Sequence, residues 1–275
     1  MPDFGKLSVQ MGHRQRVWRK RFWQAVRPTA VSCPVFLIGC GRSGTSMLVW
    51  QLDQSWQVNL YNEDHPAAFD NFRLRNLAVI DQLIARSRAP ITVFKPILDT
   101  VQTPILMERY TNGRFVFAFR NYSDVVNSSL KKFGVNNRIG HVTRWLNDDF
   151  SEFSAAPPPE KTKTFIRQRW QPDLTPEEGA ALYWLFYNRL YFDLNLHQSD
   201  RVHLICYETF VQQPEQEFRR LCQFLDISFE RRMADGIFAS SIRRDAAPNI
   251  RDSIRADCEA MYAQLSAESE VLAGK

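Results

Sequence analysis

The sequence predicts an α/β fold, with an open, mostly parallel sheet flanked by helices. Short apolar runs alternate with longer segments of helical spacing, which is typical of strands joined by crossover helices. The first of these runs, 35–38, ends at Gly39 and is followed by a glycine turn and then a helical pattern. The chain has 275 residues, of which 44% are hydrophobic and 24% charged, as in an ordinary folded domain.

Residues 1–30 form a basic N-terminal segment that we expect to be helical. Trp18, Phe22 and Val26 share one helical face, and arginines occupy the positions between them. We expect this helix to pack on the domain's own core with its basic face in solvent. The alternative is an interfacial helix that lies on anionic lipid and makes a peripheral membrane contact.

Residues 31–275 are expected to form a single domain. The predicted strands are 35–39, 57–61, 91–94, 114–119 and 202–207. Helices are predicted after Gly44 and over 68–87, 103–110, 122–133, 139–153, 176–197, 214–225 and the last twenty residues. Thr175 and Glu178 form a capping box. The stretch 154–163 is expected to be a proline-rich loop, within a helical cap or insertion around 135–180.

The glycine turn after the first strand predicts an anion site. A strand, a glycine turn and a helix aim backbone N–H groups and the positive end of the helix dipole at an anion. Gly39 and Gly44 have the spacing of a phosphate loop, but the lysine that nucleotide triphosphatases use there is absent. The loop supplies a different set of donors: Gly41, Arg42, Ser43, Gly44, Thr45 and Ser46.

A second cation follows the clearest later strand, 114–119. Arg120 ends this strand, and a helix with Asn121 or Ser123 as its cap begins directly afterwards. Asp124 and Ser128 lie on one face of that helix, near the strand end that presents Arg120.

Polar side chains also follow the second and third strands. Glu63, Asp64 and His65 come after the second strand, and Lys95 ends the third. In open α/β sheets, ligands bind at the carboxyl ends of the strands. These side chains are therefore candidates for catalysis.

Three segments resemble the sulfotransferase family: FLIGCGRSGTSML, RFVFAFRNYSDVVNSSLKKFG and VHLICYETFVQQPEQEFRRLCQFLDISFE. They cover under a third of the chain and occur in the family's order, in the style of bacterial and Golgi-type carbohydrate sulfotransferases. The resemblance implies a fold like that of P-loop nucleotide triphosphatases. It also implies transfer of a sulfuryl group from 3′-phosphoadenosine 5′-phosphosulfate (PAPS) to a hydroxyl or amine, by in-line displacement with a general base and without a required metal.

The resemblance also implies residue roles. The glycine loop, residues 41–46, would hold the 5′-phosphosulfate. Arg120 and Ser128 would hold the 3′-phosphate. The segment SSIRRDAAPN, which lacks the family's usual glycine, offers Arg243 and Arg244 for the same group. Glu63 is the expected base, and His65 and Asp64 are its rivals. Arg42 and the loop amides would stabilise the leaving group, Lys95 would contact the leaving phosphate or the acceptor, and Asp124 would be structural.

Charge and composition limit the partners. A net charge of +5 and a pI near 9.0 suit an anionic ligand, but the excess is too small and too evenly spread to indicate nucleic acid. The expected acceptor is a small molecule, a carbohydrate or a lipid. Five scattered cysteines, with no secretory signal and no long apolar run, predict reduced thiols and a cytoplasmic location.

Two other functions remain open. The glycine spacing also fits a P-loop nucleotide kinase or triphosphatase, in which Glu208, after the last strand, would organise magnesium. A loop that binds phosphate without turnover would make the protein a non-catalytic anion-binding module.

Overall fold

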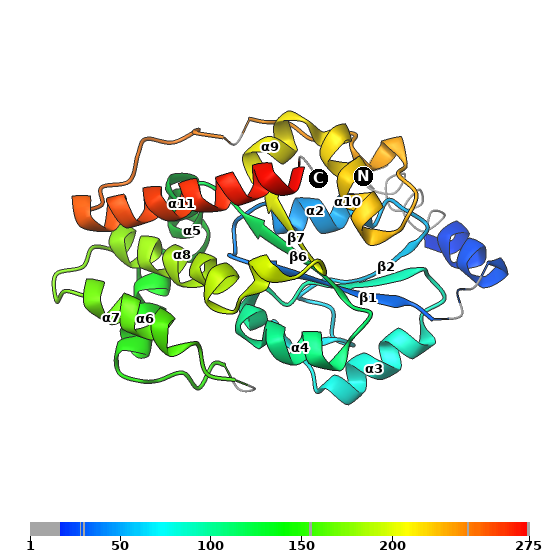
Figure 1. Cartoon of the computed structure of the whole chain (residues 1–275), viewed down its shortest axis with the longest axis horizontal. Coiled ribbons are helices and arrows are strands. Elements are labelled where there is room, and N and C mark those ends of the chain that lie inside the picture. Colours follow the sequence, from blue (N-terminus) through cyan, green and yellow to red (C-terminus); the bar gives the residue numbers. More distant parts are fainter. Residues whose placement is uncertain (1–16, 28, 30, 154–155, 241, 274–275) are drawn as a thin grey trace, which may run out of the picture.

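The computed structural model describes residues 17–27, 29, 31–153, 156–240 and 242–273. Its centre is a five-stranded parallel sheet with the order β2-β5-β1-β6-β7 (Figure 1). The predicted α/β fold, with an open parallel sheet flanked by helices, is therefore confirmed. The strands are β1 (Cys33–Gly39), β2 (Val58–Tyr61), β5 (Ile91–Phe94), β6 (Arg114–Phe119) and β7 (Val202–Cys206).

Alternating side chains of the strands build two apolar layers, one on each face of the sheet. Val35 and Leu37 of β1 join the layer under α2 (Thr45–Leu52), α9 (Tyr207–Gln212) and α10 (Pro214–Leu225). Phe36 and Ile38 join the opposite layer, which includes α3 (Leu77–Arg86), α4 (Thr103–Arg109), α8 (Pro176–Asp193) and α11 (Asp252–Ala273). Both faces are covered, which explains why the strands read as continuous apolar runs rather than alternating ones.

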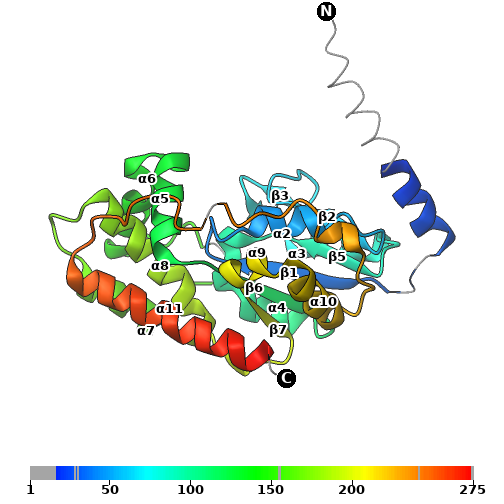
Figure 2. The same ribbon diagram turned by 90° about the horizontal axis from the view of Figure 1, so that it is seen from above.

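The α-helices between β6 and β7 gather at one end of the molecule (Figures 1 and 2). They are α5 (Tyr122–Phe133), α6 (Val135–Leu146), α7 (Glu160–Arg169) and α8. The predicted caps are present. Asn121 caps α5 by accepting from the Ser123 N–H, and Thr175 and Glu178 form the capping box of α8. The described residues also include three short 3₁₀ turns: η1 (Ile97–Gln102), η2 (Leu196–Gln198) and η3 (Arg231–Met233).

Several predicted helix boundaries are wrong. Residues 69–74 form a small hairpin of β3 (Phe69–Asp70) and β4 (Arg73–Leu74) instead of the start of a helix. Asn71 and Phe72 adopt positive φ angles of 48° and 63°, which a helix excludes. Helix α6 begins earlier and ends earlier than predicted, at Val135 and Leu146, and α7 begins at Glu160, inside the predicted loop.

The N-terminal helix packs on the domain with a different face from the one predicted. Residues 17–26 are helical, and Lys20 donates to the Asp53 carboxylate at 2.6 Å. Gln24 donates to the carbonyls of Trp56 and Val58 at 2.9 and 3.2 Å, and the Trp23 ring meets Trp56 edge-on. Polar contacts thus set the orientation of the helix. The predicted apolar face is exposed, by 69% at Trp18, 59% at Phe22 and 58% at Val26. Residues 1–16 lie outside the described part of the chain.

In the described part of the chain, no helix combines the length and the apolar character needed to cross a bilayer.

Candidate active site

The glycine loop lies where the chain changes direction across the sheet. From β1 the chain adds β2 and β5 on one side, and then β6 and β7 on the other. The loop of residues 40–44 leaves the carboxyl end of β1 at this switch point, which is where open α/β sheets bind ligands.

Two glycines allow the loop to pass close to its neighbours. A Cβ on Gly39, where φ is +119°, would collide with the carbonyl oxygen of Ala118 and lie 3.1 Å from its nitrogen. A Cβ on Gly44, where φ is +78°, would collide with the Tyr207 ring and lie 2.5 Å from its Cε2 atom. Gly44 is also the N-cap of α2 and has no side chain to occupy the first amides of that helix. These amides are therefore available to an anion.

Ser43 adds an unsatisfied hydroxyl to the loop. Its side chain is buried, and its Oγ has no hydrogen-bond partner in the described residues. Buried polar atoms normally find a partner, so an orphaned hydroxyl beside open amides fits a site that is completed by a ligand.

Arg42 joins the loop to the second predicted anion site. Its φ is 71°, and its Nε donates to the Ser128 Oγ at 2.9 Å. Burial lowers the pKa of the Arg42 guanidinium, and the nearby positive charges of Arg120 and Arg138 lower it further. Like charges this close favour a bound anion that would separate them.

A cationic cavity of about 350 Å³ opens beside Arg42. Two ion pairs lie in its wall, Arg120 with Asp124 at 3.0 Å and Lys131 with Asp245 at 2.6 Å. The Arg120 guanidinium also stacks over the Tyr207 ring, 4.4 Å from its centroid. Positive charge is in excess in this wall, which consists of Arg42, Arg120, Asp124, Ser128, Lys131, Lys132, Arg244 and Asp245.

Asp124 is an anchor for the segment that follows η3. The Asp124 carboxylate accepts a hydrogen bond from the Arg120 side chain. It also accepts from the backbone N–H of Arg243, which lies 3.1 Å from Oδ1 and 3.2 Å from Oδ2 of Asp124. The Arg243 side chain is exposed and is not part of the cavity wall, whereas its neighbour Arg244 is. The structure thus brings Arg120, Ser128 and Arg42 together, and it places only the backbone of Arg243 with them.

Lys95 connects the glycine loop to Glu63. Its ammonium group is buried and donates to the Ser46 Oγ and to the Glu63 Oε1, both at 2.9 Å. Glu63 remains partly exposed, with 29% of its side chain accessible. The carboxylate is therefore held beside the first turn of α2 and can still be reached by a substrate.

The two rivals of Glu63 are oriented differently. His65 is exposed, its Nδ1 accepts from the Ala67 N–H at 3.2 Å, and its ring packs edge-on against Tyr61. Asp64 is also exposed and accepts from the side-chain amide of Asn62 at 2.8 Å. Of the three, Glu63 is the one that is linked to the glycine loop, through Lys95.

Sequence reasoning missed several residues of this site. Lys131 and Lys132 follow Ser128 at helical spacings of three and four, a signal that was available. Tyr207 was expected to end a strand but begins α9, and its role as the surface under Arg120 depends on tertiary packing. The same is true of Arg138, which comes from α6.

Glu208 does not have the environment expected of a magnesium-organising acid. Its Oε1 accepts from the Asn121 N–H at 3.0 Å and its Oε2 from the Tyr262 hydroxyl at 3.2 Å. It therefore ties the first turn of α9 to the start of α5 and to α11. Among the residues that the structure describes, no group of three or more His, Cys, Asp or Glu side chains is arranged to hold a metal ion.

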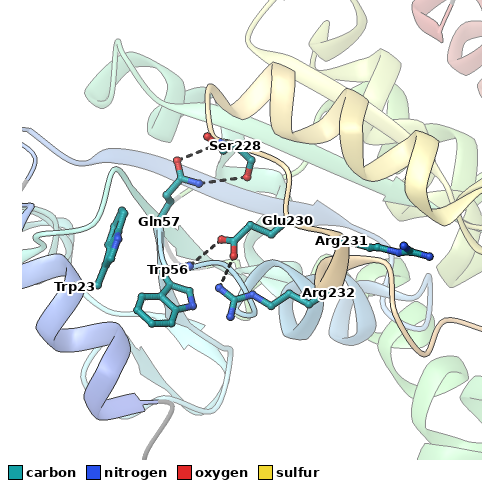
Figure 3. Close-up of a pocket in the computed structure, with 7 residues that line it drawn as sticks. All are labelled: Trp23, Trp56, Gln57, Ser228, Glu230, Arg231 and Arg232. Carbon is teal, nitrogen blue, oxygen red and sulfur yellow. Dashed lines mark hydrogen bonds and ion pairs between the residues drawn. The ribbon is translucent and has the colours of Figure 1, made fainter.

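A larger hollow, of about 700 Å³, lies at the opposite end of β2 (Figure 3). Gln57 and Ser228 exchange two hydrogen bonds of 3.2 Å there, and Glu230 accepts from the Trp56 N–H and pairs with Arg232. Trp23 and Arg231 complete its lining. It contains none of the predicted site residues.

Comparisons with known proteins agree with the predicted family. A model of the sulfotransferase family matches residues 160–231. A sequence search of the curated proteins finds no match.

Several solved sulfotransferase structures have a similar chain course. One, from Alicyclobacillus acidocaldarius, has 19% identity and a TM-score of 0.49, covering 89% of this chain and 97% of that one. The sulfotransferase domain from the curacin biosynthetic pathway has 16% identity and a TM-score of 0.47, covering 86% and 99%. A mouse sulfotransferase complexed with PAP has 12% identity and a TM-score of 0.46, covering 87% and 86%.

At these identities and TM-scores, the structural likenesses transfer no residue role to this chain. The family-model match, over a stretch that includes α8, β7 and α10, confirms the resemblance to the sulfotransferase family that the sequence shows.

Proposed function

We propose that this protein is a sulfotransferase that moves a sulfuryl group from PAPS to a hydroxyl or amine of an acceptor. The observation that carries the proposal is the meeting of two anion sites at the 2.9 Å hydrogen bond between Arg42 and Ser128. The donor has two separate anionic groups, a 5′-phosphosulfate and a 3′-phosphate. The glycine loop suits the first, and the cavity with Arg120 and Ser128 suits the second.

The proposed reaction is an in-line displacement at sulfur. The acceptor oxygen or nitrogen forms a bond to sulfur, and its proton passes to the Glu63 carboxylate. The bond between sulfur and the bridging oxygen breaks, and its electron pair stays on the 5′-phosphate. The products are the sulfated acceptor and 3′,5′-diphosphoadenosine. Lys95 orients Glu63 for this step through the 2.9 Å ion pair.

The glycine loop would stabilise the charge that develops during the transfer. Negative charge grows on the bridging oxygen during transfer, and pre-positioned N–H groups and cations stabilise such charge. We assign this role to Arg42 and the amides of residues 43–46, with Lys95 behind Ser46. The proposal gives no role to a metal, because a sulfuryl group carries less charge than a phosphoryl group.

We also propose that the N-terminal helix contacts an anionic membrane surface. Its exposed stripe of Trp18, Phe22 and Val26 is accompanied by exposed arginines at positions 19, 21 and 27. Apolar side chains beside arginines suit an interface with acidic lipid headgroups. Figures 1 and 2 show this helix far from α6 and α7.

Sedimentation with vesicles tests this contact. Binding to phosphatidylcholine vesicles that contain phosphatidylserine, lost in a Trp18→Ser/Phe22→Ser variant, is the expected result. Equal sedimentation of the variant, or no sedimentation of the parent protein, would exclude the surface as a membrane contact.

Thermal unfolding tests the enzymatic proposal. A ligand at a hundredfold its dissociation constant stabilises a protein by roughly 2.7 kcal/mol. In a chain of this size that raises the melting temperature by about 5–11 °C, at roughly 2–4 °C per kcal/mol. We expect this shift with 3′,5′-diphosphoadenosine and not with magnesium ATP. A shift with magnesium ATP alone would favour the kinase, and the absence of any shift would exclude the proposed donor site.

A further inference from the structure

Arg138 on α6 is a buried cation without an anion. It is only 5% exposed. Its guanidinium lies between two aromatic rings, 3.9 Å from the centroid of Tyr183 and 4.4 Å from that of Phe133. Within the described residues, its side chain makes no hydrogen bond or ion pair, and its Nε is buried without a partner.

This arrangement is unusual within the molecule and unfavourable without a ligand. Removing a charge from water carries a large free-energy penalty unless it is paired, and stacking on rings offsets only part of it. Among the described residues, the other arginine that is as deeply buried, Arg120, pairs with Asp124 at 3.0 Å. Arg138 therefore has the charge and the unused donors of an anion-binding residue.

The position of Arg138 indicates where an anion would bind. Its Nη2 lies 3.4 Å from the point that a Cβ on Gly41 would occupy. Its charge also lowers the pKa of Arg42. Because Arg138 borders the glycine loop and is not part of the wall of the cavity with Arg120 and Ser128, it faces the end of the donor that the loop would hold.

We propose that Arg138 binds the sulfuryl group of the donor at the glycine loop. This inference rests on the proposed sulfotransferase function and adds to it a residue from the helical cap. In the reaction the acceptor bonds to sulfur, the bond from sulfur to the bridging oxygen breaks with its electrons, and Glu63 takes the acceptor's proton. An arginine supplied from outside a phosphate loop stabilises the charge of a transferring phosphoryl group, and Arg138 would do the same for a sulfuryl group.

The ring stack explains why an arginine suits this position. Between Tyr183 and Phe133, a flat guanidinium can direct its N–H groups only within its own plane. One edge of that plane borders Gly41, which has no side chain to fill the space. Arg138 is thereby held in position before the donor binds.

Calorimetry of an Arg138→Met variant tests the proposal. The two ligands are PAPS, which has the sulfuryl group, and 3′,5′-diphosphoadenosine, which lacks it. We expect the variant to bind PAPS roughly 10- to 100-fold more weakly, the value of one charge-assisted hydrogen bond or slightly more. Its affinity for 3′,5′-diphosphoadenosine should change less than about threefold. The matched control is Arg144→Met on the same helix, where the arginine is 47% exposed and pairs with Glu152. It should bind both ligands like the parent protein.

The unliganded melting temperature provides a second measurement. Replacing an unpaired buried charge with a methionine should leave that temperature unchanged or raise it. If the variant melts lower, or loses affinity equally for both ligands, Arg138 has a packing role and the proposal is wrong. Unchanged affinity for PAPS would also overturn it. If the parent protein binds neither ligand, the proposed function itself fails, and this inference fails with it.

Discussion

Gly44 joins the two halves of the candidate active site, and its replacement by alanine makes the sharpest prediction. The residue adopts a φ of +78°, and an added Cβ would collide with the ring of Tyr207. That ring is only 9% exposed and has Arg120 stacked on it, 4.4 Å from its centroid. The substitution therefore strains the glycine loop and displaces the surface that supports Arg120.

The size of the effect follows from two contributions. A left-handed conformation costs a non-glycine residue about 1–2 kcal/mol. Overpacking a buried ring typically costs a further 1–3 kcal/mol. The free energy of unfolding should therefore fall by about 2–5 kcal/mol. This lowers the melting temperature by about 4–20 °C, at roughly 2–4 °C per kcal/mol. Binding of 3′,5′-diphosphoadenosine should weaken as well, because Arg120 moves.

Gly236→Ala is the matched control for this substitution. Gly236 has a similar φ of +73°, but a Cβ there would meet nothing within 4 Å. Gly236→Ala should lose only the stability that the left-handed backbone conformation costs, and it should bind 3′,5′-diphosphoadenosine like the parent protein. If thermal unfolding and calorimetry give the same values for Gly44→Ala and Gly236→Ala, the contact between the loop and Tyr207 does not matter and the reasoning is refuted.

Three further predictions test other parts of the site. Glu63→Gln should lower the rate at which 3′,5′-diphosphoadenosine forms from PAPS by about 10²–10⁴-fold, measured with an acceptor mixture. Binding of that product should stay unchanged. Normal turnover would mean that another residue is the base. Arg120→Met should weaken binding of 3′,5′-diphosphoadenosine by about 10- to 100-fold but leave that of adenosine 5′-phosphate unaltered, and equal losses would exclude its assignment to the 3′-phosphate. Burial raises the pKa of Glu178, but hydrogen bonds from Arg251 and from the Thr175 N–H outweigh this and lower it from 4.5 to about 2. This stabilises the folded protein above about pH 4.5, and the stabilisation is lost as the pH falls toward 2. Between these pH values the parent protein should lose more stability than Arg251→Met in denaturant titrations; parallel losses would contradict the assignment.

The sheet could be predicted because its signal is local. The central strands β1, β5 and β6 are short, mostly apolar runs that end at or just before Gly39, Lys95 and Arg120, and burial on both faces makes such runs continuous. Capping signals were equally direct, as Thr175 and Glu178 show at the start of α8. Residues 69–74 could not be predicted in this way. Phe69 and Phe72 fit a helical spacing, but the positive φ of Phe72 places it in a hairpin turn.

The candidate site was predictable where residues belong to one strand and the turn or helix that follows it. Arg120 and Ser128 are examples, since the strand end and helix spacing bring them together. The hydrogen bond between Arg42 and Ser128 joins residues 86 positions apart, and no local pattern indicates it. Arg138 reaches the loop from α6 through the stack on Tyr183, which depends on how three helices pack. The face of the N-terminal helix that packs on the domain was set in the same way, by Lys20 and Gln24 reaching residues of the domain.

The central claim is that one site binds a nucleotide with two separate phosphates. Calorimetric titration of the parent protein with 3′,5′-diphosphoadenosine and with adenosine 5′-phosphate tests it most directly. The two ligands differ only in the 3′-phosphate that the cavity with Arg120 and Ser128 would hold. Two charge-assisted hydrogen bonds at roughly 1.5 kcal/mol each predict that the diphosphate binds about 100-fold more tightly or better. Equal affinities for the two nucleotides, or no binding of either, would contradict the account.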